Sequence, residues 1–550
     1  MTTNISKEKR DILVNKIKEI KQFIASSPQD ENTSTLLSYI ADIEKDIKGK
    51  KYGLVFEEHK EAIDEMLEGH TPVLSEEKEL FIDNGGQMNF LLEGDNLASL
   101  QLLEKTHKGA IDFIYIDPPY NTGNNDFMYD DKFVGKEDCF KHSQWLSFMK
   151  SRLSIARNIM SSDGVLFMSI DDYEITPAKM LLDEIFGENN TQIMIWRKSG
   201  DGRDGKMKNT TTFRIDHEYL LVAHKSIAKL NKLCALPNFV NDYPNPDNDP
   251  RGNYKAGSIS RKESASNPNH KNYYTVTSPS GKTFTRQFDI SKEEFDILNN
   301  DILINCDGKP VSRIYWGKND DSVPSSKIFI NEERMVTPSS ILLNNGTTTE
   351  GTKELNEILQ GEYSSMRPKP SQLIKTLIQL GSQKDSVILD FFAGSGTTGQ
   401  SCLQQNVRDG GNRKFILCTN NQNNICREIT YERIKRVIEK EDYKASLKYM
   451  KVDFVPISDK LYYEYADELL KHIKELVELE NGINFDGNNE LSIILTEEEL
   501  DNFTKNISNE CKTIYLGHDV LPTEEQEKLF KKHKIKVNII PDYYYRDLEG

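Results

Sequence analysis

The residues best suited to chemistry follow a short apolar run that ends abruptly. Residues 111–116 predict a strand, which leads directly into Asp117, Pro118, Pro119 and Tyr120. The two prolines fix the backbone and carry no N–H donor, so the carbonyl oxygens of this corner are left to accept hydrogen bonds beside the Asp117 carboxylate. Two acceptors and a flat aromatic ring suit an –NH2 group on a planar ring, which is what a flipped-out adenine or cytosine presents.

This corner predicts transfer of a group to an exocyclic amine by direct displacement. The nitrogen lone pair of such an amine is delocalised into its ring, and two acceptors on its hydrogens can draw it toward sp3 geometry and expose the lone pair. No Pro-Cys pair occurs in the sequence, so the cysteine nucleophile of methylation at carbon 5 of cytosine is missing. The alternative interpretation is a rigid turn between strand and loop, without chemistry.

A glycine-rich loop follows a second apolar strand, far along the chain. Residues 387–399 read Val-Ile-Leu-Asp-Phe-Phe-Ala-Gly-Ser-Gly-Thr-Thr-Gly, in which Gly394, Gly396 and Gly399 give the spacing G-x-G-x-x-G. Glycines here allow a tight turn and let a ligand approach the backbone closely. Both NAD(P) and S-adenosylmethionine use such loops, and a purely structural turn fits the pattern as well.

Two features favour S-adenosylmethionine over a dinucleotide. A dinucleotide site requires an acidic residue about 20 positions after the loop, where residues 418–422 read Cys-Thr-Asn-Asn-Gln. Asp390 precedes the loop, and its carboxylate would repel a pyrophosphate but attract the ammonium group of a methionine. The sequence therefore predicts a methyl-donor site at this loop.

The two sites need a frame of strands and helices. Apolar strands alternate with amphipathic helices over residues 88–198 and again over 369–439. This alternation predicts a Rossmann-like, doubly wound α/β sheet that is split in sequence into two halves. We expect a helical segment at 1–70, the two halves of the sheet at 71–198 and 351–450, an insertion at 199–350, and a small α/β domain at 451–550, which could contact a partner or a second copy.

The insertion is basic, although the chain as a whole is acidic. The 550 residues carry 70 Lys and Arg against 87 Asp and Glu, a net charge of −17, whereas residues 191–290 carry 16 Lys and Arg against 9 Asp and Glu. A basic stretch in an acidic chain is a candidate nucleic-acid footprint. Chance clustering of charge is the competing explanation.

Composition argues against several other classes of protein. The chain is 37% hydrophobic and 29% charged, which is ordinary for a globular protein. No apolar run approaches the ~20 residues of a membrane span, and residues 1–10 do not resemble a signal peptide, so we expect a cytoplasmic protein. The seven cysteines form no Cys-x-x-Cys pair, and we expect neither a metal site nor a disulfide framework.

Together these motifs resemble the DNA amino-methyltransferases in which Asp-Pro-Pro-Tyr precedes Phe-x-Gly-x-Gly, the β arrangement. More closely, the chain resembles the modification (Mod) subunit of type III restriction-modification systems. The likeness extends to Glu93-Gly-Asp-Asn-Leu97, Ser169-Ile-Asp-Asp172, Asn345-Gly-Thr-Thr348 and Pro368-Lys-Pro370. It implies sequence-specific methylation of adenine N6 in double-stranded DNA by base flipping, with S-adenosylmethionine as cofactor and no metal.

The resemblance also implies roles for individual residues. Asp117 and the Pro118 carbonyl would receive the amino group, with Pro119 completing the corner and Tyr120 stacking on the base. The residues expected at the cofactor are Asp95, Asn96, Asp117, Lys369, Asp390, Phe392, Gly394, Ser395, Gly396 and Thr397. The contact to the cofactor ribose is left unassigned.

The insertion would be the target-recognition region, gripping phosphates and reading base edges. The residues expected along the phosphates are Arg197, Lys198, Arg203, Lys206 and Lys208, and those expected at bases are Arg251, Arg261 and Arg286.

Three hypotheses about function stay open. The first is adenine-N6 methylation of DNA, and the second is methylation of cytosine N4 or of RNA, because either amine suits two acceptors. The third is a specificity subunit that binds DNA chiefly for a nuclease partner. The resemblance further implies a homodimer and, in a complete system, a separate nuclease and translocase subunit (Res); a solitary methyltransferase is equally compatible.

Overall fold

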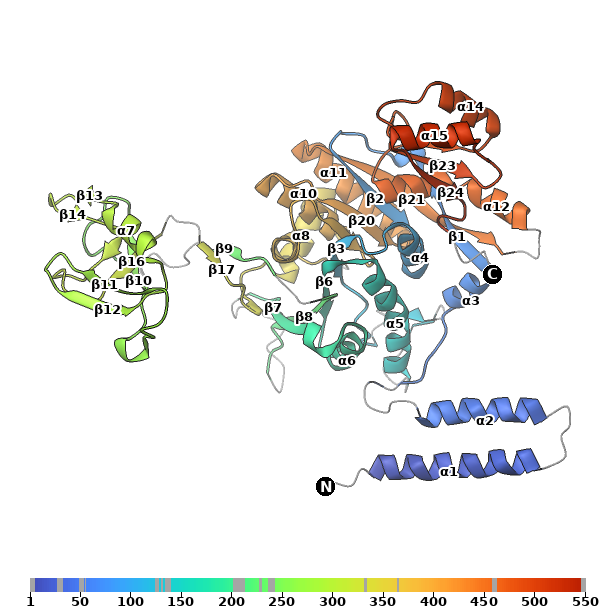
Figure 1. Ribbon diagram of the computed structural model, residues 1–550, viewed down its shortest axis with the longest axis horizontal. Coiled ribbons are helices and arrows are strands. Elements are labelled where there is room, and N and C mark those ends of the chain that lie inside the picture. The colour runs from blue at the N-terminus through green and yellow to red at the C-terminus, as the bar shows by residue number, and fades with distance from the viewer. Residues whose placement is uncertain are drawn as a thin grey trace. The chain divides into compact units, whose positions relative to one another are not determined.

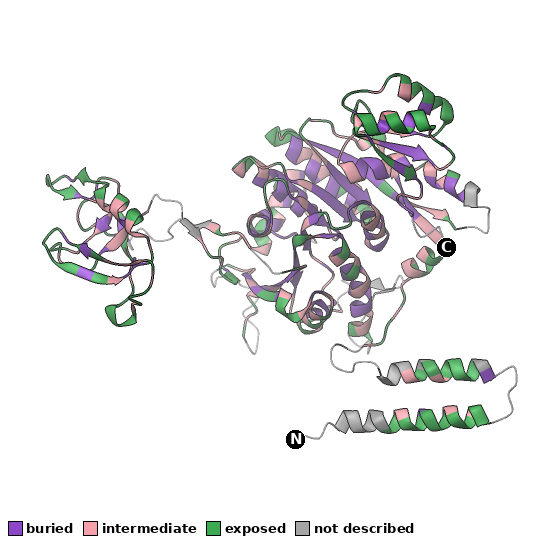
Figure 2. Ribbon diagram, in the orientation of Figure 1, coloured by how far each residue is buried: buried purple, intermediate pink, exposed green. Residues whose placement is uncertain are grey.

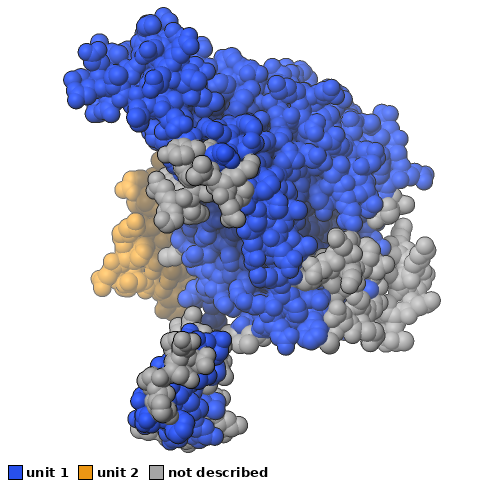
Figure 3. All heavy atoms as spheres, turned by 90° about the vertical axis from the view of Figure 1, so that its right-hand side faces the viewer, with its two compact units in different colours: residues 1–229, 340–550 blue, residues 230–339 orange. Residues whose placement is uncertain are grey.

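The computed structural model describes residues 5–26, 33–48, 54, 56–123, 128–129, 132–133, 140–200, 213–226, 230–235, 243–330, 334–363, 366–457 and 462–545. The chain divides into two units, residues 230–339 and the remainder (Figure 3). Among the described residues, no helix is long and apolar enough to cross a membrane. In the same part of the chain, His, Cys, Asp and Glu side chains form no group of three or more that could hold a metal ion.

A ten-stranded sheet forms the centre of the larger unit (Figure 1). Its strands lie in the order β1 (His70–Glu76), β21 (Ala445–Pro456), β2 (Gln87–Glu93), β20 (Lys414–Thr419), β19 (Val387–Asp390), β3 (Ile111–Ile116), β6 (Met160–Ile170), β8 (His217–His224), β7 (Thr191–Arg197) and β18 (Ile341–Leu342). The strands from β21 to β6 are parallel, while β1 and β8 run antiparallel to their neighbours. The predicted doubly wound sheet, built from two halves that are separate in sequence, is confirmed.

Two sets of helices pack against this sheet. One set, whose members contact one another in series, is α13 (Ile473–Asn481), α4 (Asn96–Thr106), α5 (Lys141–Ile159) and α6 (Ile175–Phe186). The other is α8 (Thr348–Leu359), α11 (Glu432–Glu441), α10 (Thr397–Asp409) and α9 (Ser371–Gly381). The central strands are buried (Figure 2), and in β6 every residue from 164 to 170 is buried. Such apolar runs are what a strand covered on both faces requires.

The N-terminal segment forms helices, as predicted. α1 (Ile5–Ser26) pairs with α2 (Thr33–Lys48), and an ion pair of 2.6 Å joins Lys21 to Glu44. α3 (Ala62–Gly69) follows before β1. Large apolar side chains remain exposed on the first two helices, namely Ile12, Leu13, Ile20, Phe23, Leu36, Leu37, Tyr39 and Ile43. That these helices dock on a partner stays a prediction.

The insertion is shorter than the predicted 199–350, because β8 and β18 belong to the central sheet. β8 contains residues 219–223, Tyr-Leu-Leu-Val-Ala, and it pairs with β6 on one side and β7 on the other. Such an apolar strand gains more from burial inside the sheet than from a place in a polar insertion.

The described residues of the smaller unit, 230–339, form mostly short antiparallel strands, together with the helix α7 (Lys292–Asn300) and a 3-10 turn at Glu263–Ala265. One antiparallel hairpin consists of β11 (Tyr273–Thr277) and β12 (Thr283–Gln287). The other strands described there are β9 (Leu233–Ala235), β10 (Tyr254–Ser258), β13 (Leu303–Ile304), β14 (Pro310–Val311), β15 (Ile314–Tyr315), β16 (Ser325–Phe329) and β17 (Arg334–Val336).

The C-terminal region differs from prediction at its start, because the expected boundary at 451 falls inside β21. Two helices, α12 (Tyr462–Leu470) and α13, follow that strand. The small α/β set is confirmed as a parallel sheet of β22 (Leu491–Ile494), β23 (Thr513–Gly517) and β24 (Lys536–Ile540), with α14 (Glu497–Lys505) and α15 (Glu524–His533).

Candidate functional site

The two sequence motifs meet at one edge of the central sheet. β3 and β19 are parallel neighbours, with Ile388 opposite Phe113 and Leu389 opposite Ile114. Asp117 follows the end of β3 and Asp390 ends β19, so both carboxylates lie at the carboxyl edge. From β19 the sheet continues to β20, and from β3 it continues in the opposite direction to β6. Such a reversal opens the crevice in which α/β sheets bind ligands.

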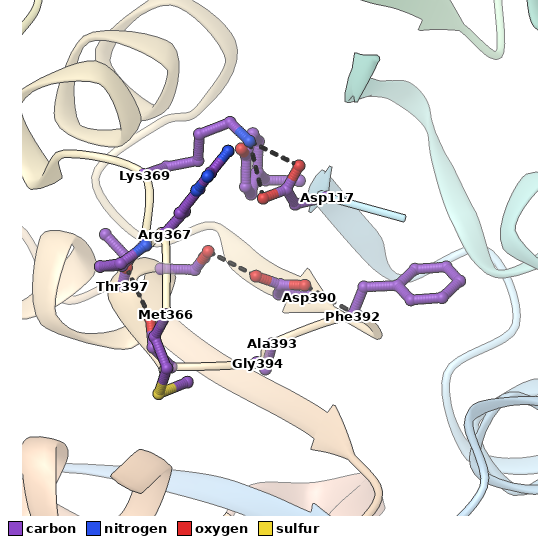
Figure 4. Close-up of a pocket in the computed structure, with 13 residues that line it drawn as sticks. Asp117, Met366, Arg367, Lys369, Asp390, Phe392, Ala393, Gly394 and Thr397 are labelled. Atoms are coloured by element: carbon purple, nitrogen blue, oxygen red, sulfur yellow. Dashed lines mark hydrogen bonds and ion pairs between the residues drawn. The ribbon is translucent and has the colours of Figure 1, made fainter. Parts of the chain in front are cut away.

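A cavity of about 190 Å³ lies at this edge (Figure 4). Its lining residues come from three segments: the end of β3, the glycine loop, and the approach to α9. They are Tyr115, Asp117, Met366, Arg367, Pro368, Lys369, Asp390, Phe392, Ala393, Gly394, Ser395, Thr397 and Thr398. Sequence reasoning missed Met366 and Arg367, although they directly precede the Pro-Lys-Pro stretch that it singled out.

Lys369 is bonded to the acceptor corner. Its Nζ atom lies 2.7 Å from Asp117 Oδ1, 2.8 Å from Asp117 Oδ2 and 2.7 Å from the Tyr120 hydroxyl oxygen. Burial acts to lower the pKa of Lys369, but the carboxylates of Asp117 and Glu218 outweigh it and raise that pKa above its ordinary value. Lys369 is therefore an ammonium group that holds Asp117 on both oxygens.

Glu218 joins this cluster from the antiparallel strand β8. Because β8 runs opposite to β6, its first residues lie at the edge where β3 and β6 end; Tyr219 pairs with Ile170. Glu218 Oε2 accepts from the Tyr120 hydroxyl at 3.1 Å and lies 3.4 Å from Lys369 Nζ, while Lys198 Nζ reaches Oε1 at 3.3 Å. Burial acts to raise the Glu218 pKa, but the two ammonium groups outweigh it and lower that pKa.

Glu218 was missed by sequence reasoning because β8 was missed. A signal was present: this acidic residue stands at the start of the apolar run 219–223. Recognising an antiparallel strand there would have placed its first residues at the same sheet edge as Asp117.

The two proline carbonyls of the corner differ in their hydrogen bonding. The Trp145 indole N–H donates to the Pro119 carbonyl at 2.7 Å, which takes that oxygen out of the set of acceptors that sequence reasoning left available. No donor within the described ranges reaches the Pro118 carbonyl. The role expected of the Pro118 carbonyl stays a prediction, and Pro119 anchors the corner to α5.

The glycine loop turns sharply between β19 and α10. Gly394 and Gly396 adopt φ of +49° and +77°, a left-handed conformation that glycine adopts at low cost. A Cβ on Gly396 would lie 3.1 Å from Thr430 Cγ2, and one on Gly399 would lie 2.7 Å from Ile434 Cδ1. The first two glycines therefore serve the turn, and Gly399 serves close packing of α10.

A buried arginine supports this loop from α11. Arg433 Nη1 donates to the Ser395 carbonyl, the Ser395 hydroxyl and the Thr397 hydroxyl at 3.2, 3.0 and 2.8 Å, and its Nε donates to Gln400 at 2.7 Å. The hydroxyls of Ser395 and Thr397, which are expected at the cofactor, therefore also bind Arg433 and stabilise the loop. Arg433 was missed, although it shares a helix face with Val437 and so stands where an apolar residue is expected.

Asp390 is almost completely buried, at 2% exposure. Its carboxylate accepts from the Phe392 backbone N–H at 2.9 Å and from the Thr398 hydroxyl at 2.6 Å. Burial raises the pKa of Asp390 to about 7. This carboxylate faces the cavity with two neutral donors and would gain from a cationic ligand.

Asp95 and Asn96 lie at the start of α4. Asp95 caps the helix by accepting from the Leu97 N–H at 2.7 Å, and the Asn96 side chain donates to the Phe391 carbonyl at 3.2 Å. Arg152 in turn donates to Asn96. These residues, like Gly396, do not line the 190 Å³ cavity, but Asn96 ties α4 to the segment that carries the glycine loop.

The residues expected to contact DNA lie in different environments. Arg203, Lys206 and Lys208 fall outside the described residues, and Lys198 is paired with Glu218. In the smaller unit, Arg261 is exposed and Arg286 is half-buried.

The role expected of Arg251 at DNA bases is corrected by its contacts in the structure. It makes two bonds to the buried Asp249, at 2.9 and 3.0 Å, and donates to the carbonyls of Asp301 and Val311. Since its guanidinium is committed to these partners, Arg251 supports the fold of the smaller unit, and we no longer expect it to read bases.

Comparison with known proteins gives one family and several relatives. Residues 111–439 match the model of the N6 and N4 methyltransferase family, described as DNA methylase. The type III restriction-modification enzyme StyLTI Mod subunit of Salmonella typhimurium is 32% identical over 396 residues, covering 65% of this chain and 58% of its own length. The type II methyltransferase M.KpnI of Klebsiella pneumoniae is 33% identical over 348 residues, covering 60% of this chain and 79% of its own.

A third relative is the type III restriction-modification enzyme EcoPI Mod subunit of Escherichia phage P1, which is 30% identical over 386 residues. The alignment covers 61% of this chain and 58% of that subunit. The chain thus spans less than two thirds of the length of these two Mod subunits.

Proposed function

Because the chain belongs to the family of N6 and N4 DNA methylases, we propose that it transfers a methyl group from S-adenosylmethionine to adenine N6 in double-stranded DNA. The observation that carries the proposal is the meeting of two strand ends. Asp117, in the corner suited to an amino group, and Asp390, beside the glycine loop, line the same cavity. Direct displacement needs a nucleophile and its methyl group about 3 Å apart, which adjacent strand ends can provide.

The residues at the cavity fit the cofactor. Asp390 offers a buried carboxylate without a cationic partner among its hydrogen bonds, which suits an ammonium group. The left-handed Gly394 leaves the cavity wall without a side chain, and Phe392 adds an aromatic surface. S-adenosylmethionine would supply a methyl group on a positively charged sulfur.

Asp117 and the Pro118 carbonyl would orient the amino group. The base would leave the duplex, because its amino group is otherwise paired and out of reach. Trp145 fixes the corner through the Pro119 carbonyl, so the Pro118 carbonyl keeps its direction. When the nitrogen bonds to the methyl carbon and the carbon–sulfur bond breaks, the nitrogen carries one proton too many, and Asp117 is the carboxylate placed to accept it.

The wider setting follows the relatives. We propose that the chain is the modification subunit of a type III restriction-modification system, that the smaller unit contributes to target recognition through residues such as Arg261 and Arg286, and that two copies associate. Cleavage of DNA would belong to a separate Res subunit. A pull-down with a Res candidate encoded beside this chain would test that last point.

The test is transfer of tritiated methyl from S-adenosylmethionine to unmethylated duplex DNA, with the product nucleoside resolved by mass spectrometry. We expect N6-methyladenine from the wild type and none from Asp117→Ala. N4-methylcytosine would establish the alternative amine, and transfer to RNA alone would establish a different substrate. Binding of S-adenosylmethionine without transfer to any nucleic acid would contradict the proposal.

A further inference from the structure

Lys369 is bonded to the carboxylate that the proposed function assigns to the substrate amino group. The ammonium donates to both oxygens of Asp117, at 2.7 and 2.8 Å. An incoming adenine amino group needs one of those oxygens, and a neutral amine does not compete well with an ammonium for a carboxylate. In this conformation the acceptor corner is therefore closed by the chain's own cation.

The same cluster contains a second carboxylate that Lys369 can reach. Lys369 Nζ is 3.4 Å from Glu218 Oε2 and 2.7 Å from the Tyr120 hydroxyl oxygen, which itself lies 3.1 Å from that Oε2 atom. Lys369 is 8% exposed and Glu218 is 9% exposed. A small movement of the ammonium would exchange the carboxylate of Asp117 for that of Glu218.

The Tyr120 hydroxyl lies within hydrogen-bond distance of both carboxylates. It lies 2.9 Å from Asp117 Oδ1 and 3.1 Å from Glu218 Oε2, but it has a single hydrogen to donate. While Lys369 is on Asp117, the hydroxyl can serve Glu218. Once Lys369 is on Glu218, the hydroxyl can turn to Asp117.

Charge explains why a second carboxylate is needed. Removing Lys369 from Asp117 without a new partner would leave a buried cation unpaired, at a cost that the entry of a neutral base could not repay. With Glu218 in place, the ammonium keeps a carboxylate partner throughout. Lys198, bonded to the other oxygen of Glu218, holds that carboxylate in position.

Resting on the proposed function, we propose that Lys369 stands in for the adenine amino group on Asp117 and that Glu218 is the positioning residue that takes over Lys369 when the base enters. Glu218 does not touch the reacting atoms. It acts through Lys369, and its loss should affect the reaction only when Lys369 is present.

The experiment is a double-mutant cycle of Glu218→Gln and Lys369→Met. Single-turnover methyl transfer to DNA is measured with saturating S-adenosylmethionine, and cofactor affinity is measured separately by calorimetry. We expect E218Q to slow transfer at least tenfold with cofactor affinity unchanged within twofold, because Lys369 then stays on Asp117. In the K369M background, E218Q should change the rate less than twofold.

Two controls separate this role from a general loss of structure. Glu478→Gln removes another fully buried carboxylate, which pairs with Lys448 at 2.7 Å, and it should leave the transfer rate per folded molecule unchanged. Glu218→Asp keeps the charge and should retain more activity than E218Q.

The inference is overturned if E218Q transfers at the wild-type rate, if Asp and Gln at position 218 are equally slow, or if the two substitutions slow the reaction independently. In each of these cases the proposed function still stands. If instead the wild type methylates no nucleic acid, the proposed function fails and this inference fails with it.

Discussion

The ends of β3 and β19 place the same residue type in two different environments. Asp117 is 28% exposed at its side chain and is paired with the Lys369 ammonium. Asp390, on the neighbouring strand, is 2% exposed, and this burial raises its pKa to about 7 although its carboxylate accepts hydrogen bonds from a backbone N–H and a hydroxyl. One carboxylate already has a cation, and the other is suited to receive one. The difference shows how two aspartates at one edge can serve two ligands.

The comparison predicts that loss of the Asp117 carboxylate stops chemistry and spares cofactor binding. Asp117→Asn should lower the rate of methyl transfer by about 10²–10⁴-fold, because it removes an acceptor and base at the amino group. Cofactor affinity, measured by calorimetry, should change little. A large loss of affinity with the rate at saturation preserved would assign Asp117 to the cofactor instead.

At the end of β19, we expect loss of the Asp390 carboxylate to reduce cofactor affinity more than the rate of methyl transfer. Asp390→Asn should weaken S-adenosylmethionine binding by about 10–100-fold, since a hydrogen bond to a charged group contributes about 1.5–3 kcal/mol. Transfer at saturating cofactor should fall much less than in D117N. Equal effects of both variants on both quantities would remove the distinction between the two ends.

The raised pKa of Asp390 predicts a pH dependence. A cation binds the ionised carboxylate, so cofactor affinity should rise as pH increases through about 7 and the group loses its proton. Between pH 6 and 7.5 the dissociation constant should fall roughly eightfold, by linkage to this one group. In D390N the affinity should be nearly flat over that range, and a flat profile in the wild type would contradict the assignment.

The smallest effect is expected from the glycine turn itself. Gly396→Ala places a Cβ at φ +77°, 3.1 Å from Thr430, and should cost about 1–2 kcal/mol of stability. Gly410→Ala is the matched control, since Gly410 is also left-handed, at φ +65°, but its Cβ would meet no atom within 4 Å. Thermal unfolding of both variants would separate backbone strain from contact with Thr430, and equal shifts would show that the contact costs nothing.

Local patterns in the sequence were enough to predict the strands and the two motifs. β3 has the predicted bounds, 111–116, because its apolar run and the turn that follows it are local signals. The corner at residues 117–120 could be predicted for the same reason, because two adjacent prolines constrain the backbone without help from distant residues.

Tertiary structure decided the partners of these residues. The sequence around Asp117 does not indicate that Lys369, 252 positions away, is its partner. Nor does it indicate Glu218, which reaches the site because β8 joins the sheet in the antiparallel direction. The resemblance implied that Arg251 contacts bases, but its guanidinium is bonded to Asp249 and to two backbone carbonyls. A sequence determines which groups a chain can offer at a strand end, but burial and long-range pairing set the charge and hydrogen bonds that remain for a ligand.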